Sequence, residues 1–199
     1  MELILVRHGL PQRVERESGA ADPELSDTGW LQAKAVGKWL ADNEEIDTVY
    51  ASPMNRARQT AEPFAELAGH NINFVEEVAE FDRKSRAYVP MEQLKKENYA
   101  AWQRMAGGNY GSNVDLTKFR DTVVQGLENV IEQNRGKRAA VFCHGGVINV
   151  WATHCLGLEP KLFTDVRYCS INRSMCASTG QRNLQSLNET QHLVADSLV

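Results

Sequence analysis

The sequence lacks any pair of cysteines at the spacing of a metal site or a disulfide framework. Its four cysteines are scattered and form no Cys-x-x-Cys motif: Cys143, Cys155, Cys169 and Cys176. Scattered cysteines of this kind are typical of reduced thiols in an intracellular protein. We therefore expect a cytoplasmic protein with free thiols and without a metal ion.

Long apolar runs, strong net charge and a glycine-rich phosphate loop are also missing. No apolar run approaches the ~20 residues that a helix needs to span a bilayer, and the N-terminus has no feature of a signal peptide. A net charge of −4 gives no general attraction to nucleic acid or anionic lipid. Without a glycine-rich loop, nucleotide-driven kinase chemistry is disfavoured. We expect binding to neither nucleic acid nor membrane.

What the chain does contain is enough apolar sequence for one core. It has 199 residues, of which 42% are hydrophobic, as in ordinary folded domains. Short apolar runs predict strands at residues 3–6, 47–51, 72–75 and 139–143, and one or two more around a turn at 179–180. Helices are predicted over 26–43, after 52, after 90, from 117 to a stop at 135–137, and from 146 to about 157.

Strands that alternate with long helices predict an α/β fold. We expect a single domain over residues 1–199, built as three α/β/α layers around a mostly parallel sheet. Residues 10–24 are predicted to be a loop, and Gly107, Gly108 and Gly111 mark another.

Local signals mark the starts and apolar faces of the helices. Ser26 and Thr117 are predicted N-caps, and Ser52-Pro53 combines a capping hydroxyl with proline at the first helical position. The residues at helical spacing are Leu31, Ala35 and Trp39; Ala57, Ala61, Phe64 and Ala68; Leu94, Tyr99 and Trp102; and Phe119, Val123, Leu127, Val130 and Ile131.

Ligands of such folds bind at the carboxyl ends of the parallel strands. His8, Ser52 and His144 each lie just past a predicted strand, and a glycine follows each histidine. A neutral imidazole is a competent nucleophile toward phosphorus near pH 7. Phosphoryl transfer also needs cations around the transferred oxygens, and Arg7 precedes His8.

Two further arginines, Arg56 and Arg58, lie in the first turns of the helix after Ser52-Pro53. Helix starts favour anions. The two side chains flank Ala57 of the apolar face on opposite sides, so helical geometry leaves the choice between them open.

Several blocks in order resemble the histidine phosphatase superfamily, whose members include cofactor-dependent phosphoglycerate mutases. Leu5-Val6-Arg7-His8-Gly9 resembles its signature, residues 51–62 its second block, and Cys143-His144-Gly145-Gly146 its late His-Gly block. Residues 23–33 match the usual lead-in to the first helix. The resemblance covers residues 3 to about 157 and implies a phosphoglycerate mutase-like fold.

The resemblance implies roles at matching positions. His8 would be the phosphorylated nucleophile. Arg7 and Arg56 would bind the phosphoryl oxygens, which selects Arg56 over Arg58. His144, followed by Gly145, would complete the phosphate pocket.

The acid–base carboxylate of the family usually ends an apolar-x-Glu pattern after the third strand. Val78-Ala79-Glu80 fits, so Glu80 would protonate the leaving oxygen and later activate water. Glu76, Glu77 and Asp82 lie nearby as other carboxylates.

The chain departs from the family pattern at two places, and both put the substrate in doubt. Leu10-Pro11-Gln12-Arg13 follows the signature, and residues 81–86 replace a glycine-rich stretch after Glu80. Arg13 is predicted to replace a missing substrate contact, although a loop arginine is more often solvated. Residues 81–115 are predicted to form a variable cap over the pocket, with Arg86 as a substrate contact.

The sequence therefore predicts a histidine acid phosphatase-type enzyme that needs neither metal nor cofactor. It would hydrolyse a small phosphomonoester through a phosphohistidine on His8. The alternatives are a phosphoglycerate mutase-type phosphotransferase and a non-catalytic binding domain on the same fold. The oligomeric state is not predicted.

Overall fold

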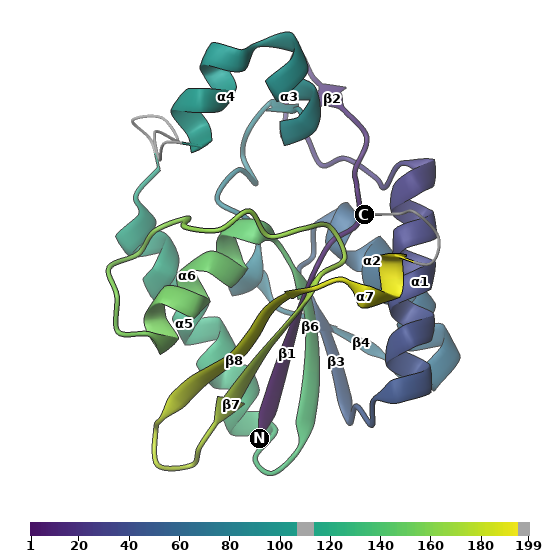
Figure 1. The fold of residues 1–199 in the computed structure, drawn as a ribbon, viewed down its shortest axis with the longest axis vertical. Helices are drawn as coiled ribbons and strands as arrows, with labels where there is room; N and C mark the ends of the chain where they lie inside the picture. The colour runs from purple at the N-terminus through teal and green to yellow at the C-terminus, as the bar shows by residue number, and fades with distance from the viewer. Residues whose placement is uncertain (107–113, 195–199) are drawn as a thin grey trace.

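The computed structural model describes residues 1–106 and 114–194, which form a six-stranded sheet with helices on both faces (Figure 1). The strand order is β4-β3-β6-β1-β7-β8. The four parallel strands are β1 (Glu2–Arg7), β3 (Thr48–Ala51), β4 (Ile72–Phe74) and β6 (Arg138–Cys143). β7 (Ile171–Cys176) and β8 (Arg182–Glu189) add an antiparallel hairpin at one edge. The predicted mostly parallel α/β/α fold is confirmed.

Helices cover each face of the sheet, which explains why its central strands are apolar throughout. α1 (Asp27–Asn43), α2 (Asn55–Ala68) and α7 (Gln191–Val194) lie on one face (Figure 1). α5 (Leu116–Gln133) and α6 (Gly145–Cys155) lie on the other. Residues 3–6 of β1 are fully buried because both of its faces are covered.

Residues 76–106 carry small elements beyond the carboxyl ends of the parallel strands (Figure 1). They are the 3₁₀ helix η1 (Glu76–Val78), β5 (Ala87–Tyr88), α3 (Met91–Glu97) and α4 (Tyr99–Ala106). β5 pairs with β2 (Val14–Glu15), so the predicted loop at 10–24 contains a short strand. Gly107, Gly108 and Gly111 lie outside the described residues.

Two helix starts differ from the predictions. Ser26 caps α1 as predicted, accepting from Gly29 N. However, α2 begins at Asn55 after the N-cap Met54, because the Ser52 hydroxyl lies too early and bonds elsewhere. Asp115, not Thr117, caps α5 and accepts from Lys118 N at 3.0 Å. A charged carboxylate is the better partner for a positive helix end.

Two predicted apolar faces are shifted. Leu31 is 55% exposed and Ala68 is also exposed. The buried face of α1 instead includes Gln32, because its side chain accepts from Leu10 N at the end of the signature loop. The predicted helix after residue 90 is two helices, broken at Asn98, whose side chain accepts from Ala101 N and starts α4.

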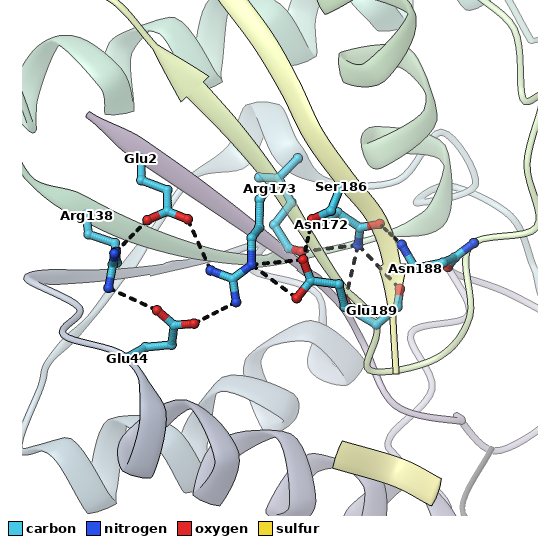
Figure 2. Close-up of polar contacts among 10 residues, drawn as sticks. Glu2, Glu44, Arg138, Asn172, Arg173, Ser186, Asn188 and Glu189 are labelled. Carbon is cyan, nitrogen blue, oxygen red and sulfur yellow. Dashed lines mark hydrogen bonds and ion pairs between the residues drawn. The ribbon is translucent and has the colours of Figure 1, made fainter. Parts of the chain in front are cut away.

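A polar network lies at the amino ends of β1 and β6, away from the elements at residues 76–106 (Figure 2). Arg173 of β7 bonds to three carboxylates: Glu2 at 3.1 Å, Glu44 at 2.6 Å and Glu189 at 3.0 Å. Arg138 shares Glu2 and Glu44 with it. The network ties the start of β1, the end of α1 and the C-terminal hairpin together.

All four cysteines are free thiols. No helix in residues 1–106 and 114–194 is both long and apolar enough to cross a membrane.

Candidate active site

His8 follows the last residue of β1 and is 2% exposed. Its backbone N–H donates to Cys143 O at 3.0 Å, which fixes it beside the end of β6. Its Nδ1 lies 2.8 Å from Gly9 O. Because a carbonyl only accepts, Nδ1 carries the proton and Nε2 keeps its lone pair. Burial, then Arg56 and Arg7, hold the pKa of His8 well below its usual value, so the imidazole is neutral.

Arg7 is clamped by the segment before β7. Its Nη1 donates to Val166 O, its backbone N–H donates to Ser170 O at 3.2 Å, and its guanidinium lies 3.9 Å from the centre of the Tyr168 ring. Cys169 N donates to His8 O in the same segment. These contacts leave the guanidinium with little freedom to move.

Arg56 reaches the end of β1 from the first turn of α2 and is only 1% exposed. Its Nε donates to His8 Nε2 at 3.3 Å. Its Nη2 pairs with Asp82 at 2.9 Å, and its guanidinium lies 4.8 Å from the centre of the Tyr88 ring. The helix places Arg56 inward, whereas Arg58 is 38% exposed and pairs with Glu62.

His144 ends β6 at the N-cap position of α6 and is fully buried. Its ring centre lies 5.2 Å from that of His8. Its Nε2 bonds to Ser52 Oγ at 2.8 Å. The hydroxyl that was expected to cap α2 therefore bonds to His144 instead. Burial, Arg56 and His8 hold the pKa of His144 well below its usual value, so the His144 imidazole is neutral.

Glu80 lies just after η1 and is 8% exposed. It accepts from Gly146 N at 2.8 Å and from Phe81 N at 3.1 Å. A Cβ at position 146 would lie 2.2 Å from Glu80 Oε1, so a side chain there would displace the carboxylate. Burial first, and then the charge of Asp82, raise the pKa of Glu80 to about 7, against the opposing effect of Arg56. The carboxyl group therefore exchanges its proton near neutral pH.

Three buried nitrogens around His8 have no hydrogen-bond partner within the part of the chain that the structure describes: Arg7 Nε, Arg56 Nη1 and His144 Nδ1. Leaving buried donors unpaired costs free energy, about 1–3 kcal/mol each. Two of them belong to permanently charged guanidinium groups. Such a set of convergent donors is suited to an oxyanion such as a phosphoryl group.

The other two predicted substrate residues lie elsewhere. Arg13 is 41% exposed and pairs with Glu97 at 2.6 Å and with Glu15. Arg86 is exposed beside β5, and its carbonyl accepts from Arg16 N. Gly145, in contrast, borders the site, since a Cβ there would lie 3.5 Å from Arg7 Nε. Substrate binding by Arg13 and Arg86 stays a prediction.

Three residues at the site had no assigned role in the sequence interpretation: Ser52, Asp82 and Tyr168. Ser52 was noticed as a strand-end residue and Asp82 as a neighbour of Glu80. Tyr168 lies in an irregular segment with no motif or periodicity, so no sequence signal marks it. Among the described residues, no group of three or more His, Cys, Asp and Glu side chains is arranged to hold a metal ion.

The family model of the histidine phosphatase superfamily (branch 1) matches residues 3–190. The chain belongs to this superfamily. The predicted resemblance is therefore confirmed, and it extends beyond residue 157 to β8.

Relatives of this superfamily member include phosphatases and phosphoglycerate mutases. A probable phosphatase of Schizosaccharomyces pombe is 32% identical over 175 residues, covering 82% of this chain and 77% of the relative. A metal-independent phosphoserine phosphatase of Arabidopsis thaliana is 29% identical over 164 residues, covering 74% and 65%. These relatives support a phosphatase-type enzyme.

A solved structure also matches nearly the whole chain. It is a phosphoserine phosphatase of Entamoeba histolytica in complex with 3-phosphoglyceric acid, with a TM-score of 0.73 and 25% identity. The match covers 96% of this chain and 98% of the other. The fold is thus that of a family whose structures hold small phosphorylated compounds.

Proposed function

We propose that the protein is a metal-independent phosphatase that hydrolyses a small phosphomonoester through a phosphohistidine on His8 Nε2. The observation that carries this proposal is a neutral imidazole whose Nε2 lone pair faces Arg56 Nε, beside buried guanidinium nitrogens that have no partner among the described residues. A bound phosphoryl group would supply acceptors for those donors. Arg7 and Arg56 would offset the charge of the transferred group.

The reaction has two steps. In the first, His8 Nε2 attacks phosphorus, the P–O bond to the alcohol breaks, and the protonated Glu80 gives its proton to the leaving oxygen. In the second, water attacks the phosphohistidine, the P–N bond breaks, and the Glu80 carboxylate takes a proton from that water. A carboxyl group with a pKa of about 7 suits both tasks.

The substrate is proposed to be a small phosphorylated metabolite. The Arabidopsis relative is a phosphoserine phosphatase, and the matched Entamoeba phosphoserine phosphatase holds 3-phosphoglyceric acid. Both compounds are small phosphorylated acids, so we take them as the first substrates to test. We further propose a single domain in which residues 81–115 form the cap over the pocket, of which 107–113 lie outside the described residues; Asp82 and Tyr88 of this segment contact Arg56.

The test is a panel of phosphorylated metabolites scored by phosphate release. Phosphoserine or a similar ester should release phosphate, without added metal, and faster than 3-phosphoglycerate isomerises with a trace of bisphosphoglycerate. Faster isomerisation would identify a mutase. Absence of turnover on every ester, p-nitrophenyl phosphate included, would favour the non-catalytic binding domain.

Replacing Glu80 by glutamine should reduce kcat/KM toward alkyl phosphates by about 100-fold or more, because the leaving alkoxide would lose its proton donor. The loss should be much smaller for p-nitrophenyl phosphate, whose leaving group is a weaker base. Rates with the two esters measure this. An equal loss on both would contradict the role of Glu80 as an acid.

The pH dependence of kcat/KM of the unmodified enzyme should follow the protonation of Glu80. Glu80 must be protonated for the first step, so kcat/KM should fall as pH rises through about 7. The E80Q enzyme should lack that decline. A decline that persists in E80Q would assign it to another group.

A further inference from the structure

Asp82 lies beside the site, and the proposed reaction leaves its carboxylate without a task. It lies two residues after Glu80, in the stretch where the chain departs from its family. Its Oδ1 accepts from Arg56 Nη2 at 2.9 Å, and its side chain is 26% exposed while that of Arg56 is 1% exposed. Breaking an ion pair of a buried arginine costs more free energy than breaking an exposed pair, because the buried charge is left without a partner.

The ion pair determines how the Arg56 guanidinium is oriented. Nη2 faces Asp82, Nε faces His8, and the Tyr88 ring lies near the guanidinium at 4.8 Å. Nη1 is the remaining nitrogen, and it has no partner among the described residues. With Nη2 held by Asp82 and Nε donating to His8 Nε2, Nη1 is the donor left for a phosphoryl group at His8.

Asp82 also sets the charge around the acid–base residue. Glu80 faces the positive charge of Arg56 from α2, the N–H of Gly146 at the start of α6, the N–H of Phe81 and the nearby thiol of Cys143. Apart from burial, the charge of Asp82 is the main influence that raises the pKa of Glu80. Arg56 itself faces Asp82, Glu80, Tyr88 and His8.

We propose that Asp82 is a positioning residue of the phosphoryl transfer: it orients the Arg56 guanidinium and places a fixed negative charge beside both Arg56 and Glu80. This inference rests on the proposed function. The carboxylate occupies a donor that a bound phosphate dianion would otherwise use. It therefore weakens the binding of phosphate in the ground state. At the same time it holds the Arg56 guanidinium in its orientation and favours the protonated form of Glu80 near neutral pH.

Replacing Asp82 by asparagine should separate kcat from ground-state binding. Asparagine keeps an oxygen for Arg56 Nη2 but removes the charge. We expect inorganic phosphate to inhibit D82N about threefold or more tightly, while kcat falls about tenfold. A residue that only supports the fold would weaken both quantities together.

The pH profile supplies a second measurement. Because removal of a like charge lowers the pKa of Glu80, the decline of kcat/KM on the alkaline side should move to lower pH by about half a unit or more in D82N. D82E keeps the charge and should restore the parent profile. E76Q removes a carboxylate that is 65% exposed and pairs with Arg83, so it should leave the profile and the inhibition unchanged.

These outcomes decide the inference separately from the proposed function. Parent enzyme that releases no phosphate from any ester would overturn the proposed function and the inference with it. Active parent enzyme, with D82N at the parent values of phosphate inhibition and pH profile, would overturn the inference alone. If D82N melts early, the same two measurements on D82E and on a D82S enzyme decide it: a parent-like profile in D82S contradicts the role.

Discussion

Replacing His8 by alanine is expected to lower kcat by about four orders of magnitude or more, because the group that accepts the phosphoryl is removed. The methyl side chain has no lone pair, and the unpartnered nitrogens around it cannot act as a nucleophile. Phosphate binding should survive, since Arg7, Arg56 and His144 remain. The phosphoenzyme of the parent should be trapped by acid-free quenching after a pulse of radiolabelled substrate.

The matched control is H70A, which removes a histidine whose ring packs on Phe64 at 6.0 Å, away from His8. H70A should be labelled like the parent, and H8A should not. Label on a residue other than His8, or turnover by H8A close to that of the parent, would refute covalent catalysis by this histidine.

Replacing Arg173 by methionine is expected to lower the free energy of unfolding by about 3 kcal/mol. The change leaves Glu2 and Glu44 with Arg138 as their remaining cation and removes the ion pair of Glu189 (Figure 2). The Arg173 side chain is only 14% exposed, so solvent would offset little of this loss. The melting temperature should drop by about 6–12 °C for a chain of this length.

Thermal and urea unfolding of R173M measure the effect. R135M is the matched control, because Arg135 pairs with Glu132 and the two side chains are 65% and 66% exposed. An exposed pair contributes little, so R135M should lie within about 0.5 kcal/mol of the parent. Equal stability of R173M and R135M would show that the network contributes to local order only.

Sequence reasoning predicted the proximity of the candidate residues best at strand ends. The proximity of His8 and His144 could be predicted because each follows an apolar strand, and parallel strands bring their carboxyl ends together. The family pattern predicts Glu80 as the acid–base residue, and its carboxylate lies at the start of α6, where it accepts from Gly146 N; its role stays a prediction.

The parts that could not be predicted depend on tertiary contacts of irregular segments. Tyr168 and Val166 reach Arg7 from a loop, and only the docking of β7 against β1 places that loop there. Ser52 has the local features of a helix cap, yet its hydroxyl bonds to His144, which is distant in sequence. A local pattern cannot show which of two partners a hydroxyl will choose.

The placement of β1 at the centre of the sheet has a consequence for synthesis of the chain. β1 leaves the ribosome well before its neighbours β6 and β7, so Leu5 cannot pair until Val141 and Asn172 have been synthesised. At about 5–20 residues per second this takes roughly 10–30 s. During that time residues 3–6 form an apolar segment without its neighbours, and folding through such distant pairings is slow. The candidate site can therefore form only after residues 166–170, which bond to Arg7, have been synthesised.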